Sequence, residues 1–147
     1  MTDTLRFSFD VACPPHHAFA VWTDRIGIWW PRDHTVTGDP VAIVLEGRVG
    51  GRIYERTEQG VEHDWGVITS WQPPELLAYR WHLGVGRESS TRVTIRFSTI
   101  GESATRVDVE QSDWDHLGAA AEEARSRNRS GWESLVPHFR AAIEEGA

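Results

Sequence analysis

Apolar and polar residues alternate most regularly in four segments of the chain, at residues 5–11, 76–83, 91–98 and 105–112. Each segment carries apolar side chains at every second position, which is the period of a half-buried β-strand. One apolar and one polar face are typical of an antiparallel sheet that is covered on one side and exposed to water on the other. The short connections GVGRESS and IGESA predict hairpins between the last three segments.

The region between residues 41 and 71 predicts further strands with a less regular pattern. VAIVLEG, RIYER and VEHDWGVITSW are rich in β-branched and aromatic residues, and glycine-containing turns separate them. In the last of these segments Trp65 and Val67 share one parity, whereas Ile68 has the other. This break predicts a β-bulge or a strong twist near Gly66.

Two short helices are expected after the first strand. PPHHAFAVW predicts a helix that starts near residue 14, because proline suits a first helical turn. TDRIGIWW predicts a second one, with Thr23 or Asp24 as its N-cap and Pro31 at its end. Because helix neighbours point about 100° apart, we expect Trp29 in the core and Trp30 at the mouth of any cavity.

One long amphipathic helix is expected at residues 119–145, where apolar residues recur at a spacing of three or four. Pro137 lies inside this pattern and removes a backbone hydrogen bond, and Gly131 weakens the same region. We therefore expect a bent helix, or two helices that meet near residues 131–137.

The order of these elements predicts an α+β fold, in which the long helix covers a curved antiparallel sheet of about six or seven strands. The length of 147 residues fits a single domain over residues 1–147. The elements follow the order β-α-α-β(5-6)-α.

Charge and composition narrow the range of partners. The 15 basic and 22 acidic residues give a net charge of −7, without any lysine, which argues against nucleic acid and anionic membranes as partners. No apolar run reaches the roughly 18 residues of a membrane helix, and MTDTLRFSFD does not resemble a signal peptide. The single Cys13 allows no internal disulfide. We expect a cytoplasmic protein.

Four stretches resemble, in order, the activator-of-heat-shock-protein-90-ATPase-like family of the START-like (SRPBCC, birch-pollen-allergen-like) superfamily. They are AFAVWTDRIGIWWPRDH, GRVGGRIYER, WGVITSWQPPELLAYRW and GWESLVPHF. The resemblance implies a helix-grip fold, in which the C-terminal helix lies across a curved sheet and often leaves a cavity. Pro137 departs from the family's usual uninterrupted helix. Such folds host lipid carriers, polyketide cyclases, hydrolases and chaperone regulators, so the fold leaves the function open.

Eight tryptophans are the unusual feature of the composition. These large amphipathic side chains suit cores and pocket walls, and small-molecule sites are mostly apolar. They either wall a cavity or fill it. In the helix-grip arrangement that the resemblance implies, nine residues converge between sheet and helix and are predicted to bind a ligand: Trp30, Trp65, Tyr79, Trp81, Ile95, Phe97, Trp132, Val136 and Phe139.

Catalytic and metal-binding motifs are sparse. Neither an HExxH motif nor a paired CxxC is present, so we predict no metal and no cofactor. His82 shares the parity of Arg80 and is expected to face solvent. Acid–base catalysis would need a polar side chain at the cavity mouth. The weak candidates are His34 and His63, and Glu55, Asp64 and Asp113 could also reach it.

We therefore expect a domain that binds a hydrophobic or aromatic small molecule without catalysis of its own. One alternative is a cyclase- or hydrolase-like enzyme that acts on an aromatic substrate through His34 or His63. The other is a chaperone-regulating domain with a protein partner, as the resemblance suggests.

Overall fold

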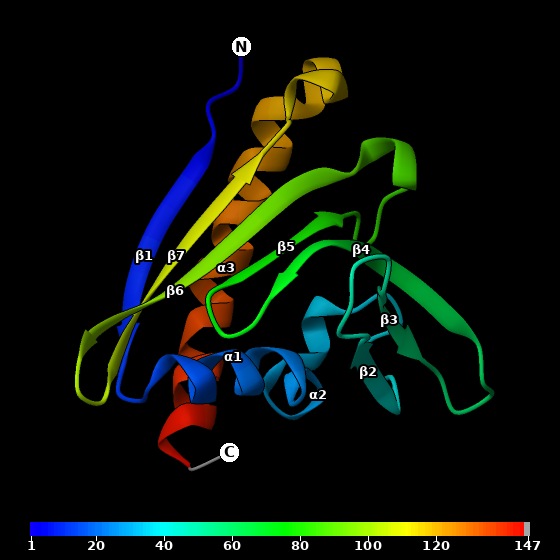
Figure 1. Cartoon of the computed structure of the whole chain (residues 1–147). Coiled ribbons are helices and arrows are strands. Elements are labelled where there is room, and N and C mark those ends of the chain that lie inside the picture. The colour runs from blue at the N-terminus through cyan, green and yellow to red at the C-terminus, as the bar shows by residue number, and fades with distance from the viewer. Residues whose placement is uncertain (146–147) are drawn as a thin grey trace.

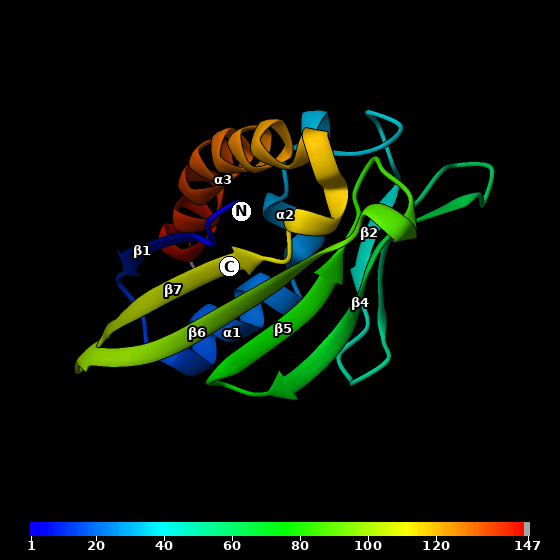
Figure 2. The ribbon, with the colours of Figure 1, turned by 90° about the horizontal axis from the view of Figure 1, so that it is seen from above.

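Seven antiparallel strands form a curled sheet in residues 1–145, the part of the chain that this computed structural model describes. Their order is β1-β7-β6-β5-β4-β3-β2, so β2 to β7 run as a meander and β1 joins the edge of β7. Figures 1 and 2 show the sheet bending around the helices. The strands are β1 (Leu5–Val11), β2 (Ala42–Leu45), β3 (Arg52–Arg56), β4 (Glu62–Gln72), β5 (Leu76–Trp81), β6 (Thr91–Gly101) and β7 (Ala104–Ser112).

The helices lie on the concave side of this sheet. The long helix α3 (Ala121–Glu144) crosses the sheet, and α1 (Pro15–Thr23) and α2 (Ile26–Trp29) lie near its C-terminal end (Figure 1). Short 3₁₀ helices occur in the connections, and they are η1 (Arg32–His34), η2 (Arg87–Ser89) and η3 (Asp115–Ala120). The predicted helix-grip fold is confirmed. No helix in residues 1–145 has the length and apolar character needed to cross a membrane.

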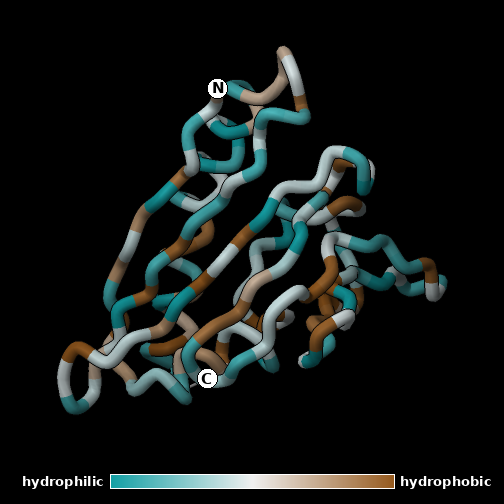
Figure 3. Tube along the Cα trace, turned by 45° about the horizontal axis from the view of Figure 1, so that its top comes forward, coloured by the Kyte–Doolittle hydropathy of each residue, from teal (hydrophilic) through white to brown (hydrophobic). Residues whose placement is uncertain are grey.

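The alternating pattern of the long strands builds the hydrophobic core. Hydrophobic and hydrophilic positions alternate along these strands in Figure 3. In β6 the side chains of Val93, Ile95 and Phe97 are buried, and in β7 those of Val107 and Val109 are buried. Burial of this apolar surface beneath the helices is the main favourable contribution to folding.

Strand β4 carries two bulges that bend the sheet. Its pairing with β3 skips Trp65, because Ile53 faces Gly66 while the next residue of β3 faces Asp64. The predicted irregularity near Gly66 is therefore confirmed, and a second one follows at Thr69, opposite β5. Gly66 is required here because any Cβ would collide with the carbonyl oxygen of Arg80 on β5.

The two short helices form where they are predicted, but the predicted cap of the second is wrong. Thr23 still belongs to α1, and its hydroxyl donates to the carbonyl of Phe19 at 2.8 Å. The N–H of Asp24 donates to the carbonyl of Ala20, so both residues end α1. Arg25 occupies the N-cap of α2, and among the described residues no side chain caps it.

Helix α3 runs without interruption through Pro137, so the prediction of two helices is wrong. Pro137 and its neighbour His138 are exposed, whereas Trp132, Leu135 and Phe139 are buried on the opposite side. The missing hydrogen bond therefore lies at the surface, where water can replace it, and the buried stripe holds the helix together.

Candidate ligand-binding cavity

A cavity of about 740 Å³ opens between the sheet and the first half of α3. One wall is the connection from β5 to β6 at residues 82–90, and the opposite wall is formed by η3 and the first turns of α3. Residues 30–35, which follow α2, close a third side. The volume falls within the range of roughly 300–1,000 Å³ that is usual for small-molecule sites.

Tryptophan side chains form most of the aromatic surface of this cavity. The ring of Trp30 lies 5.7 Å from that of Trp81 between centroids, and its indole N–H donates to the carbonyl of His34 at 2.9 Å. That hydrogen bond fixes the plane of Trp30 at the mouth. The four tryptophans in the lining are Trp30, Trp81, Trp114 and Trp132.

Trp29, the neighbour of Trp30, occupies a different environment. Its ring lies 4.9 Å from Trp22 and 5.2 Å from Phe139 between centroids. Its indole N–H donates to the carbonyl of Val21 at 2.8 Å. Trp29 therefore belongs to the core, whereas Trp30 lies at the boundary between core and cavity.

The nine residues predicted to bind a ligand are divided between cavity and core. Three of them line the cavity: Trp30, Trp81 and Trp132. Val136, on α3, is half-buried and lies outside the lining. Five others are buried and also lie outside the lining: Trp65, Tyr79, Ile95, Phe97 and Phe139. Aromatic rings of α1 fill the space there, since Trp22 contacts Phe139 and Phe19 contacts Phe97. The ligand-binding role of the nine stays a prediction.

A buried polar cluster lies against the cavity where β6, β7 and α3 meet. The indole N–H of Trp132 donates to Oε1 of Gln111 at 2.8 Å, and Gln111 is fully buried. The amide nitrogen of Gln111 donates to Oγ1 of Thr91 at 2.9 Å and to Oδ1 of Asn128 at 3.2 Å. Thr91, Asn128 and Trp132 all line the cavity, so this cluster gives it a polar spot.

His82 also lines the cavity, and the prediction that it faces solvent is wrong. Strand β5 ends at Trp81, so the alternation stops there and the chain turns inward. The N–H of His82 donates to the carbonyl of Trp65 at 2.7 Å. Its Nε2 has no hydrogen-bond partner within residues 1–145. Burial, aided by the charge of Arg87, lowers the pKa of His82 and favours the neutral imidazole.

The acid–base candidates do not gather at one place. His34 lies at the rim of the cavity, with its Nδ1 2.9 Å from Oδ1 of Asp33. His63 instead lines a more open hollow of about 690 Å³ beside β4. Asp113 pairs with Arg80 at 2.8 Å, and the hydrogen bond from this guanidinium lowers the pKa of Asp113.

Glu55 is a buried carboxylate that fixes the segment beside the mouth. It accepts hydrogen bonds from the indole of Trp65 at 2.8 Å, from the N–H of Val36 at 2.6 Å and from the hydroxyl of Thr37 at 2.7 Å. Burial by itself would raise the pKa of Glu55, but these hydrogen bonds outweigh it and lower the pKa. Glu55 is therefore an ionised anchor and does not reach the cavity.

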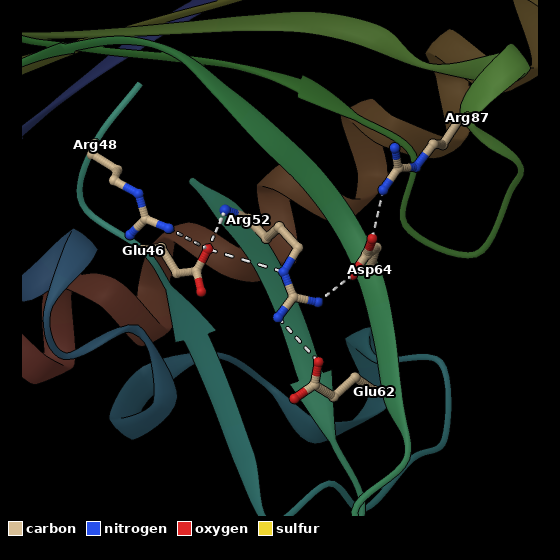
Figure 4. A network of polar contacts seen from close by, with 6 residues as sticks. All are labelled: Glu46, Arg48, Arg52, Glu62, Asp64 and Arg87. Atoms are coloured by element: carbon tan, nitrogen blue, oxygen red, sulfur yellow. Dashed lines mark hydrogen bonds and ion pairs between the residues drawn. The ribbon is translucent and has the colours of Figure 1, made fainter. Parts of the chain in front are cut away.

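An ion-pair network ties the 82–90 wall to the neighbouring strands (Figure 4). Arg87 in this wall lies 2.7 Å from Asp64 of β4, which also pairs with Arg52 of β3 at 3.0 Å. Arg52 pairs in turn with Glu62 at 3.0 Å. Burial would raise the pKa of Asp64, but the hydrogen bonds from Arg87 and Arg52 hold it below its ordinary value. The network holds the 82–90 connection against β4, where it forms one wall of the cavity.

The polar cluster was not predicted from the sequence, although two positions indicated it. Gln111 has the inward parity of Val107 and Val109, and Asn128 lies in the apolar stripe of the last helix. A polar residue at an inward position must find a hydrogen-bond partner there. No group of three or more His, Cys, Asp or Glu residues that could hold a metal ion occurs in the described residues.

The sequence model of the family "Activator of Hsp90 ATPase homolog 1-like protein" (AHSA1) matches residues 12–144. This chain belongs to that family. The match begins directly after β1 and includes the helices and strands that form the cavity. No curated protein matches the chain.

Solved structures of similar proteins share the fold of this AHSA1-like chain. The self-sacrificing resistance protein CalC from Micromonospora echinospora is 31% identical, with a TM-score of 0.75 over 98% of this chain and 96% of CalC. The anthrahydroquino-γ-pyrone synthase Txn09 is 30% identical, with a TM-score of 0.60 over 83% of this chain and 84% of Txn09. MLL2253 from Mesorhizobium loti is 17% identical, with a TM-score of 0.69 over 99% of both chains, and this likeness concerns the fold.

Proposed function

We propose that this AHSA1-like protein binds a hydrophobic, aromatic small molecule in the cavity between the 82–90 connection and the first half of α3. The observation that carries the proposal is a 740 Å³ space bordered by four tryptophans. Flat aromatic ligands gain both buried apolar area and ring contacts in such a space. The apolar and aromatic side chains of the lining are sufficient for binding, so we propose binding without catalysis.

The comparisons support a small-molecule role. Of two similar solved structures with about 30% identity, one is described as a resistance protein and the other as the synthase of an anthrahydroquino-γ-pyrone, which is an aromatic ring system. Both proteins extend over most of this chain. The description of Txn09 supports an aromatic compound as the ligand proposed for the cavity of this chain.

A titration with 1-anilinonaphthalene-8-sulfonate, whose emission rises in apolar surroundings, tests this proposal. Ala120 lines the cavity at an exposed position, so Ala120→Phe should narrow the mouth and weaken binding by about tenfold or more. Ala141→Phe, at an exposed position of α3 outside the cavity lining, is the matched control and should leave binding unchanged. Equal binding by all three proteins, or the lack of saturable binding to the wild type, would contradict the proposal.

Acid–base catalysis at the rim is a second candidate function. It is favoured by the contact of 2.9 Å between His34 Nδ1 and Asp33, because such a contact orients an imidazole towards the cavity that His34 lines. Hydrolysis of 4-nitrophenyl acetate is a simple assay. Turnover that is lost in His34→Gln and kept in His63→Gln would support this candidate. Turnover that is equal in the two variants, or absent from the wild type, would count against a hydrolase that uses His34.

A further inference from the structure

The polar cluster beside the cavity has one orientation that satisfies its hydrogen bonds. An indole N–H can donate but cannot accept, so Trp132 requires the carbonyl oxygen of the Gln111 side chain, 2.8 Å away. The amide nitrogen of Gln111 must then point the other way, towards Thr91 and Asn128. Because Gln111 is fully buried between β6 and α3, this orientation is fixed by its surroundings.

The orientation of the Gln111 amide determines whether the hydroxyl of Thr91 accepts or donates a hydrogen bond. Its Oγ1 accepts the hydrogen bond from Gln111 at 2.9 Å, so the hydroxyl proton remains available for donation. Among residues 1–145, no acceptor is hydrogen-bonded to this proton. Thr91 is 4% exposed and lines the cavity. It is therefore a buried donor whose free side is the cavity.

Asn128 is left with a free donor in the same way. Its Oδ1 accepts from Gln111 at 3.2 Å, and one N–H of its Nδ2 donates to the carbonyl of Ala124 at 2.8 Å. The second N–H of Nδ2 has no acceptor in the part of the chain that the structure describes. Asn128 lines the cavity from α3, and like Thr91 on β6 it accepts a hydrogen bond from the amide nitrogen of Gln111.

We propose that Thr91 and Asn128 bind an acceptor oxygen on the ligand, and that the cavity therefore selects aromatic compounds that carry a ketone, quinone or phenolate oxygen. This inference rests on the proposed function. One oxygen has lone pairs for both donors, and the surrounding indole rings accommodate the ring system that bears it. The exposed guanidinium of Arg127, also in the lining, adds positive charge on the same side.

The selectivity follows from what a pure hydrocarbon would do in the same place. It would cover both donors and leave them without acceptors, and a site with buried unpaired polar groups rejects such an analogue. An acceptor oxygen on the ligand accepts hydrogen bonds from both donors without any movement of Gln111. The discrimination therefore depends on Thr91 and Asn128 and does not depend on the size of the cavity.

The test compares 9-fluorenone with fluorene, two rigid molecules of nearly the same shape that differ by a carbonyl oxygen. Their affinities are measured by displacement of 1-anilinonaphthalene-8-sulfonate. Thr91→Val removes the hydroxyl at nearly constant volume, so it should weaken binding of 9-fluorenone by about tenfold and change binding of fluorene by less than about twofold. Thr91→Ser keeps the hydroxyl and should retain the preference of the wild type for the ketone.

Asn128→Asp provides a second variant at a half-buried position of α3. A carboxylate still accepts from Gln111 but offers no N–H, so the affinity for 9-fluorenone should fall again while that for fluorene is kept. The ratio of the affinities for 9-fluorenone and fluorene is measured on the same protein sample. Partial unfolding of a variant lowers both apparent affinities equally and leaves this ratio unchanged. Equal losses of both probes in Thr91→Val and Asn128→Asp would overturn the inference while the proposed function stands. Failure of both probes to bind the wild type would overturn the two together.

Discussion

The two ends of the interface between α3 and the sheet use the same kinds of side chain with opposite results. At the C-terminal end, Phe139 of α3 meets Trp22 of α1 at 4.9 Å and Trp29 of α2 at 5.2 Å between ring centroids, and the space is full. At the N-terminal end, Trp132 faces a cavity of about 740 Å³. We call these the packed end and the open end.

The difference lies in what covers the aromatic rings. The short helices α1 and α2 supply rings that fill the packed end. At the open end, the 82–90 connection and η3 form opposite walls of the cavity and do not fill it. The inward positions there carry the polar residues Gln111, Thr91 and Asn128. Polar groups at these positions need hydrogen bonds, so they favour a site that is completed by a polar partner.

The largest expected effect comes from the same substitution at each end. Leu77 belongs to the packed end, because it pairs with Trp71 of β4, whose ring lies 5.1 Å from that of Phe19 of α1 between centroids. Leu77→Ala removes this fully buried side chain and should lower the free energy of unfolding by about 3–5 kcal/mol. Leu135→Ala, on the cavity wall, should cost only about 2 kcal/mol, because this side chain already has empty space on one side. Urea unfolding measures both. Equal losses would contradict the distinction between the ends.

A smaller loss of stability is expected when the polar cluster of the open end is broken. Gln111→Met keeps the approximate size of the side chain but leaves the indole N–H of Trp132 and the hydroxyl of Thr91 without their partner. The free energy of unfolding should fall by about 1–3 kcal/mol. Gln72→Met, at an exposed position of β4, is the matched control and should cost less than about 0.5 kcal/mol.

The open end should also respond to acid. The fold holds the pKa of His82 below that of the unfolded chain, so the unfolded chain takes up the proton first as the pH falls through about 6.5. The stability that the neutral imidazole contributes is complete above that pH and declines below it. Melting temperatures between pH 8 and pH 5 should therefore fall less in His82→Gln than in the wild type. His138→Gln, at an exposed position of α3, should keep the wild-type profile.

The smallest expected effect concerns the ion pair that holds one wall of the open end. Arg87→Ala removes the contact with Asp64, and because the Arg87 side chain is 67% exposed, stability should change by less than about 1 kcal/mol. Amide hydrogen exchange in residues 82–90 should nevertheless become faster. Arg48→Ala removes an equally exposed arginine that pairs with Glu46, and it should leave exchange in this segment unchanged. Faster exchange in both variants would mean that Arg87 has no specific role.

Much of the fold could be predicted because periodicity reports which side of an element is buried. Residues 91–98 and 105–112 alternate strictly, and the structure buries the sides that this pattern indicates. The error at Pro137 has a physical reason, because the sequence gives the intrinsic cost of a helical proline but not whether its position faces water. The same holds for His82, which lies one residue beyond the end of β5, where alternation no longer applies.

The site was harder to predict because a cavity is a space that the side chains leave unfilled. Trp65 and Trp81 have equally suitable chemistry, yet Trp81 lines the cavity whereas Trp65 is completely buried behind it. Which ring faces open space depends on how α1 and α2 dock, and that arrangement has no signature in the spacing of apolar residues. The inward parity of Gln111 was the informative signal, because it requires a polar partner that a filled apolar core lacks.

Binding of an aromatic ligand at the open end can be observed directly through the eight indole N–H groups of the protein. The measurement is a titration of the ¹⁵N-labelled protein with 9-fluorenone, followed through the indole signals by NMR. We expect the largest shifts at the four tryptophans that line the cavity, Trp30, Trp81, Trp114 and Trp132, and small shifts at Trp22, Trp29, Trp65 and Trp71. Shifts that are largest in the second group, or absent from all eight signals at saturating ligand, would contradict binding at the open end.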